Sequence, residues 1–162
     1  FKDNVLISLN TLIPNKFVSF LLKNKSLPFL EDWEFDSQEV TYGHSRFDFR
    51  LIKNNFQKIV EVKSVSLVEN KIAKFPDAVT ERGARHVKHL SELISQDIET
   101  MVLFVIQRPD ADFFEPQWER DPKFSEALLN ASNKGVCVKV IKIKITPKSL
   151  IYLGEVPYKL EL

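Results

Sequence analysis

The sequence predicts an α/β fold in which a mixed central β-sheet is flanked by helices. Residues 46–51 alternate between apolar and polar side chains, as a half-buried strand does. Residues 101–106 form a continuous apolar run, which is typical of a strand buried on both faces. Residues 79–96 carry apolar side chains at helical spacing. Strands of both kinds combined with amphipathic helices indicate a layered α/β protein.

A β-hairpin is expected near the middle of the chain. Phe47, Phe49 and Leu51 fall on one face of the first strand, and the polar residues between them fall on the other. Residues 53–55 supply a turn, and residues 57–67 form the returning strand. The hairpin would bring polar side chains of the two strands opposite each other.

The remaining elements follow from the same patterns. We expect helices at residues 10–24, 79–96 and 122–132, strands at 39–42, 101–106 and 136–145, and a loop at 26–36. The apolar phase of the last strand slips between Val140 and Ile141, which predicts a bulge or bend there. The length of 162 residues suits one domain, residues 1–162.

The helix at residues 79–96 has both an apolar stripe and a polar flank. The stripe comprises Val79, Gly83, Val87, Leu90 and Ile94. Asp77 is a candidate N-cap. Arg82, His86 and His89 share a flank that faces the polar end of the sheet, so they either contact phosphate or form a solvated helix face. Two histidines at this spacing without a third ligand are a weak zinc signal.

The composition limits the classes of function. A net charge of +1 does not announce nucleic-acid binding, although a local basic patch would suffice. The single cysteine, Cys137, cannot form an internal disulfide, so a cytoplasmic location is expected. No apolar run approaches the roughly 18 residues of a membrane span, so no membrane association is expected. The chain starts at Phe1, which suggests a fragment of something longer.

Three polar residues of the hairpin form a candidate metal site. Glu61 and Lys63 leave the same face of their strand, and hairpin pairing can place Asp48 near Glu61, about 5 Å away. Two carboxylates that close repel each other unless a cation lies between them. Oxygen ligands, to which the Val62 carbonyl could add one, suit Mg²⁺ or Mn²⁺. Such an ion polarises a phosphodiester and activates a bound water. Lys63 would hold that water or stabilise negative charge on the phosphate. Glu39 could orient the other waters of the ion.

A surface ion cluster without a functional role is an alternative explanation of the same three residues. The polar face of a surface hairpin could simply carry an ion cluster of Asp48, Glu61 and Lys63, and such exposed pairs contribute little stability. The spacing alone does not decide between this alternative and a metal site.

Several blocks of the sequence carry a family resemblance. They are residues 39–43 (EVTYG), 45–49 (SRFDF), 61–65 (EVKSV), 75–83 (FPDAVTERG), His86, 8–12 (SLNTL) and 134–136 (KGV). In this order and spacing, the chain resembles the sugar fermentation stimulation protein (SfsA) family. That family is known as DNA-binding, with an N-terminal OB-like domain and a C-terminal domain similar to PD-(D/E)XK nucleases. Only the second domain matches this chain.

The resemblance implies a fold and a site. It implies a restriction-endonuclease-like (PD-(D/E)XK) core, with Asp48 and Glu61 as the two metal-binding acids and Lys63 as the motif lysine. Contact with DNA phosphate, or support of the metal ligands, is expected of Glu39, Arg46, Arg82 and His86.

Three functional hypotheses remain open. The first is a Mg²⁺- or Mn²⁺-dependent deoxyribonuclease. The second is a non-catalytic DNA-binding regulator of sugar (maltose) metabolism genes that retains the nuclease fold, because fold does not fix function. The third is a protein-interaction module, which leaves the cluster of Asp48, Glu61 and Lys63 unexplained. The sequence does not decide the oligomeric state, a homodimer included.

Overall fold

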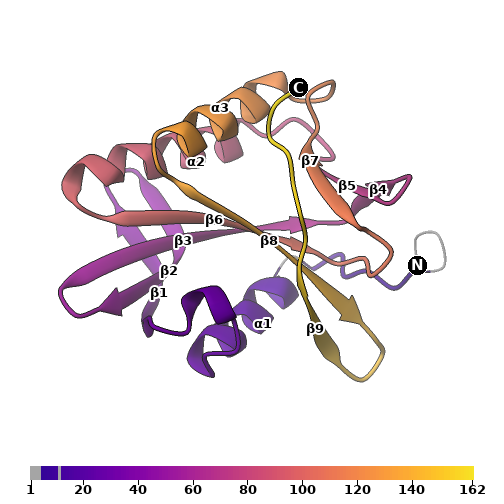
Figure 1. Ribbon diagram of the computed structural model, residues 1–162, viewed down its shortest axis with the longest axis horizontal. Coiled ribbons are helices and arrows are strands. Elements are labelled where there is room, and N and C mark those ends of the chain that lie inside the picture. Colours follow the sequence, from indigo (N-terminus) through magenta and orange to yellow (C-terminus); the bar gives the residue numbers. More distant parts are fainter. Residues whose placement is uncertain (1–4, 11) are drawn as a thin grey trace.

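Among the described residues, two β-sheets and three α-helices make up the fold (Figure 1). The structure is a computed structural model that describes residues 5–10 and 12–162, so Phe1 and Thr11 lie outside the described residues. The large sheet contains β1 (Glu34–Tyr42), β2 (Ser45–Lys53), β3 (Phe56–Val65), β6 (Glu99–Ile106), β8 (Cys137–Ile145) and β9 (Leu150–Glu155), in the order β1-β2-β3-β6-β8-β9. The small sheet contains β4 (Leu67–Glu69), β5 (Ile72–Phe75) and β7 (Phe113–Pro116). The helices are α1 (Leu12–Lys23), α2 (Glu81–Leu93) and α3 (Pro122–Asn133), with 3₁₀ turns at Pro28–Leu30 and Ile94–Gln96.

The large sheet is mixed, as the sequence predicts. β1, β2 and β3 pair antiparallel, and β2 with β3 forms the expected hairpin. β3, β6 and β8 pair parallel, and β9 closes the other edge antiparallel. The parallel pairs require crossovers, which α2 and α3 provide. The small sheet, β9 and the length of β1, which takes in part of the predicted loop 26–36, were not predicted.

Each face of the large sheet carries its own hydrophobic core (Figure 1). The first core lies under α2 and α3, which contribute Leu90 and Phe124. The second lies against α1, which contributes Leu21. β6 serves both, because Phe104 faces the first core and Leu103 the second. This confirms that residues 101–106 form a strand buried on both faces.

The two faces of the sheet correct the predicted face of β2. Phe47 packs in the first core, beside the rings of His86 and His89 on α2. Phe49 and Leu51 pack in the second core, on the side of α1. The three apolar residues therefore do not share one face, because the strand rotates at Asp48, the residue between Phe47 and Phe49.

Two predictions about the start of α2 were wrong. Thr80, not Asp77, caps α2, since its side chain accepts a hydrogen bond from the Gly83 N–H at 2.9 Å. Val79 therefore precedes the helix and is exposed, so it does not belong to the apolar stripe. A tertiary contact fixes this start, because Asp121, the N-cap of α3, also accepts a hydrogen bond from the Thr80 N–H.

The predicted bulge between Val140 and Ile141 is also corrected. Val140 lies in the first core and Ile141 in the second, which is ordinary alternation in a strand buried on both faces. The shift in register lies further along β8, between Lys142 and Ile143, where it pairs with β9.

The large sheet forks between β2 and β3, and this fork creates the candidate site. Their ladder ends at the pair of Phe49 with Val60. Beyond that pair β2 stays with β1, and β3 stays with β6. Asp48 and Glu61 are the first residues past the last pair, so both lie where the two strands separate.

No helix among the described residues is long and apolar enough to cross a membrane.

Candidate metal site at the fork of the sheet

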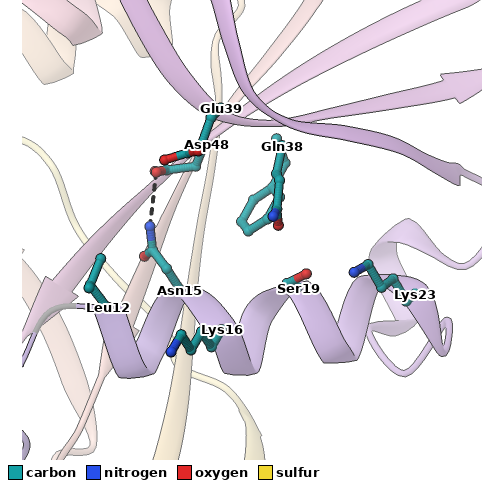
Figure 2. Close-up of a pocket in the computed structure, with 9 residues that line it drawn as sticks. Leu12, Asn15, Lys16, Ser19, Lys23, Gln38, Glu39 and Asp48 are labelled. Atoms are coloured by element: carbon teal, nitrogen blue, oxygen red, sulfur yellow. Dashed lines mark hydrogen bonds between the residues drawn. The ribbon is translucent and has the colours of Figure 1, made fainter.

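Asp48 fills the gap between the separating strands. Its Oδ2 accepts a hydrogen bond from the Val62 N–H at 2.7 Å, so the carboxylate replaces the missing backbone partner from β2. Its Oδ1 accepts a hydrogen bond from the Asn15 side chain on α1 at 2.9 Å (Figure 2). The carboxylate is thereby fixed from two sides, by β3 and by α1.

Burial, and the nearby carboxyl group of Glu61, make the ionised form of Asp48 unfavourable. The pKa of Asp48 is raised from 3.8 to about 8, first by burial, and then by hydrogen bonding to Glu61 and by the negative charge of Glu61. The hydrogen bond from Val62 and the positive charge of Lys63 oppose this rise. The two carboxyl groups are therefore close. Near neutral pH a proton on Asp48 removes the charge repulsion between them.

A histidine holds Glu61 from the other side. His86 lies on α2 with its Nδ1 at 3.0 Å from Glu61 Oε2, and both side chains are buried. The pKa of His86 is lowered to about 4, mainly by burial and next by the positive charge of Lys63. His86 is thus neutral at pH 7, and its ring donates a hydrogen bond to the carboxylate. The His86 side chain is buried against Glu61 and is not exposed at the surface of the site.

Lys63 follows Glu61 on the same face of β3 and is partly exposed. Its positive charge lowers the pKa of both Asp48 and His86, so Lys63 lies close to these two groups. Among the described residues, no hydrogen-bond or ion-pair partner holds its ammonium group. Glu61 is 5% exposed, so the alternative of an exposed ion cluster does not describe these residues.

Glu39 lies across from Asp48 on β1 in a strained conformation. Its φ is 55°, a left-handed value that costs a non-glycine residue about 1 kcal/mol or more. Its neighbours Gln38 and Val40 keep their pairing with β2, so the strain is local to Glu39. The exposed side chain lines a pocket together with Asp48 (Figure 2).

The two arginines expected at the site lie at its edges. Arg46 is exposed on β2, opposite Thr41. Arg82 is exposed in the first turn of α2, and its charge helps to lower the pKa of His86. Neither contacts Asp48 or Glu61 through a hydrogen bond or ion pair among the described residues.

Sequence reasoning missed Asn15. The sequence places it in a predicted helix, but the helix could have packed on any part of the sheet. The local signal was weak because asparagine in the first turns of a helix is usually a capping residue. Only the packing of α1 on the second core brings the Asn15 amide to Asp48.

The residues present fit a hard divalent cation. Asp48 and Glu61 supply carboxylate oxygens, and the Val62 carbonyl faces the fork because the N–H and C=O of a strand residue point to the same side. In the described part of the chain, no group of three or more His, Cys, Asp and Glu side chains is placed to hold a metal. Two carboxylates with water and substrate oxygens are nevertheless a usual site for Mg²⁺.

Comparisons with known proteins place the chain in a family. The mixed sheet with helices on both faces and a pair of facing carboxyl groups at its fork define an α/β protein with an acidic site. The family model described as the sugar fermentation stimulation protein RE domain matches residues 12–149. The chain belongs to the sugar fermentation stimulation protein family.

Individual relatives agree with this assignment. The homologue of Natranaerobius thermophilus is 40% identical over 155 residues, which cover 93% of this chain and 65% of that protein. The homologue of Clostridium perfringens strain 13 is 40% identical over 157 residues, which cover 96% of this chain and 68% of that protein. The chain thus spans about two thirds of the length of these relatives. The solved structure of Pyrococcus furiosus SfsA in complex with Ca²⁺ matches 98% of this chain and 70% of that one, with a TM-score of 0.90 and 29% identity.

Proposed function

We propose that the chain is one nuclease-like domain of the PD-(D/E)XK type that hydrolyses DNA with Mg²⁺ or Mn²⁺. The observation that carries the proposal is the facing pair of Asp48 and Glu61, in which burial, together with Glu61, raises the pKa of Asp48 to about 8. Such a pair is costly unless a cation lies between the carboxylates. The Ca²⁺ in the solved relative supports a divalent cation in this family.

Each residue of the site has a separate role in this proposal. Asp48, Glu61 and the Val62 carbonyl would hold the ion. A bound ion would polarise the scissile phosphodiester and lower the pKa of a water molecule. Lys63, whose ammonium group is not held by another described residue, would position the attacking water or stabilise negative charge on the phosphate.

The surrounding residues would keep the site ordered. His86 fixes Glu61, while Asn15 and the Val62 N–H fix Asp48, so both carboxylates are oriented before an ion arrives. Glu39 would orient waters of the ion, and Arg46 and Arg82 would contact DNA phosphates at the edges of the site.

A second candidate is a non-catalytic DNA-binding regulator of sugar metabolism genes. The observation that favours it is the family description, which names stimulation of sugar fermentation and no cleavage. The two candidates differ in one result, because a regulator binds DNA without cutting it.

Cleavage of DNA by this chain is the decisive test. We expect single- or double-stranded DNA to be cut in Mn²⁺, and the cutting to stop in EDTA and in Glu61→Gln. Glu126→Gln on the exposed side of α3 is the matched control and should cut like the unchanged chain. Cleavage that continues in EDTA or in Glu61→Gln would exclude the proposed nuclease. Binding without cleavage would support the regulator.

His86→Phe is expected to lower the affinity for Ca²⁺ by about 10–100-fold, the usual effect of losing a residue that supports a metal ligand. The phenyl ring keeps the packing against Phe47 but leaves Glu61 Oε2 without its donor. Calorimetric titration with Ca²⁺ measures the change. His86→Asn, whose amide nitrogen can replace Nδ1, should recover most of the affinity. Equal affinity in the Phe and Asn variants would contradict the orienting role.

A further inference from the structure

A groove of about 370 Å³ leads from the solvent to Asp48 (Figure 2). One wall is α1, which contributes Lys16, Ser19 and Lys23. The other wall includes Gln38 and Glu39 of β1. The groove therefore runs beside the candidate metal site and is open to a ligand that reaches Asp48.

The wall formed by α1 is basic. Lys16 and Lys23 lie seven residues apart, about two helical turns or 10 Å along one side of α1. Neither forms an ion pair with a described acidic residue, and Lys23 Nζ lies over the Phe35 ring at 4.9 Å. Two lysine cations in one groove that are not engaged in ion pairs attract an anionic ligand.

Between the lysines, the hydroxyl of Ser19 opens into the groove. Its Oγ makes no hydrogen bond within the described part of the chain, and because no buried side-chain oxygen or nitrogen of the described residues lacks a partner, this hydroxyl is accessible to solvent. Figure 2 shows the hydroxyl on the side of α1 that faces Gln38. The Gln38 amide likewise has no partner among the described residues. Gln38 is exposed and the Ser19 hydroxyl is accessible, so both can donate and accept hydrogen bonds with a ligand in the groove.

Two acidic residues lie at the Lys16 end of the groove. Glu39 and Asp48 line it there, and Asp48 is hydrogen-bonded to Asn15, the neighbour of Lys16 (Figure 2). A phosphate is accepted beside them if a cation is bound between Asp48 and Glu61. The groove thus has Lys23 at one end, the Ser19 hydroxyl in the middle, and Lys16 beside the metal site at the other end. A ligand that matches this order is a chain of phosphates, of which only the last meets the metal.

We propose that this groove binds one single strand of nucleic acid, with phosphates on Lys16 and Lys23, and leads it to the fork. The volume is near the lower limit of small-molecule sites, which suits one nucleotide at a time and not a duplex. A basic groove that follows the backbone is the usual way to bind single strands. The inference rests on the proposed function, because it takes the phosphodiester at Asp48 as the one that is cut.

Binding of labelled oligothymidylate to the whole chain tests the groove directly. In Ca²⁺ we expect the single strand to bind at least tenfold more tightly than a duplex of equal length. Lys16→Ala/Lys23→Ala should weaken this binding about tenfold and lower the slope of log affinity against log salt by about 0.7 for each lysine. Lys123→Ala/Lys134→Ala, at exposed lysines of α3 and of its C-cap, removes the same charge on the opposite face and should bind like the unchanged chain.

A second variant separates the groove from general charge. Ser19→Leu extends a side chain into the groove without changing charge, and we expect it to weaken single-strand binding more than tenfold while leaving the Ca²⁺-induced rise in Tm unchanged. Equal binding by Lys16→Ala/Lys23→Ala and its α3 control would overturn the inference, as would a duplex bound as tightly as the single strand.

Failure of the proposed function gives a different result. If the unchanged chain never cuts DNA but the two groove variants lose single-strand binding, the nuclease activity is excluded and the groove is supported. If the unchanged chain cuts DNA and the two groove variants cut with the same kcat/KM, the nuclease activity is supported and the groove is excluded.

Discussion

Asp48→Asn is expected to stabilise the metal-free protein and to abolish its response to divalent cations. A carboxyl group whose pKa is raised from 3.8 to about 8 opposes folding by up to about 6 kcal/mol above pH 8. Asparagine removes that charge. Its Oδ1 can still accept from the Val62 N–H, and its amide can donate to Asn15 after the Asn15 amide turns.

The dependence on pH has a defined sign. Between about pH 4 and pH 8 the folded protein holds a proton on Asp48 and the unfolded chain does not, so the stability of the metal-free protein falls as the pH rises through this window. Above about pH 8 both states are ionised and this contribution is constant. The Asn variant lacks the fall, so its advantage is greatest at about pH 8 and above.

Thermal unfolding at several pH values measures both effects. At pH 8 we expect the metal-free Asn variant to melt roughly 10–20 °C higher than the unchanged chain. Saturating Ca²⁺ should raise the Tm of the unchanged chain by about 5–10 °C, since a ligand at 100 times its Kd contributes about 2.7 kcal/mol. Asp112→Asn, at an exposed site, should change neither value. An Asn variant that responds to Ca²⁺ like the unchanged chain would show that Asp48 holds no metal.

Lys63→Met is expected to reduce cleavage about 10²–10³-fold, the usual effect of removing one group that stabilises charge in the transition state. Methionine keeps the apolar stem of the side chain and removes only the ammonium group, which no described residue holds. Binding of Ca²⁺ should stay within a few-fold, because Lys63 lies beside the carboxylates and is not a ligand.

Measuring DNA cleavage and Ca²⁺ binding separately tests whether Lys63 acts in the chemical step. Rates of DNA cleavage in Mn²⁺ and the Ca²⁺-induced shift in Tm are measured on the same preparation. Lys144→Met, an exposed strand lysine on β8, is the matched control and should retain full activity. Cleavage within threefold of the unchanged chain would exclude a role in the chemical step, and loss of the Ca²⁺ shift would indicate damage to the site.

The sequence by itself determined the elements whose patterns are local. The alternation around Asp48 and the turn after Lys53 predicted the hairpin, and the apolar run from Met101 to Ile106 predicted the strand at the centre of the sheet. The spacing of Glu61 and Lys63 on one strand fixed their common face, because that depends only on the two-residue period of a strand.

Only the tertiary structure decided how these elements meet. The β2–β3 ladder ends at Phe49 and Val60 because β2 continues along β1 and β3 continues along β6. Past this end, Asp48 lies in the fork, and Phe47 packs in the core on the opposite face of the sheet from Phe49. The contacts of Asn15 with Asp48 and of His86 with Glu61 join helices to strands that are far apart in the sequence. Local periodicity carries no information about such packing, which depends on how the whole chain buries its apolar surface.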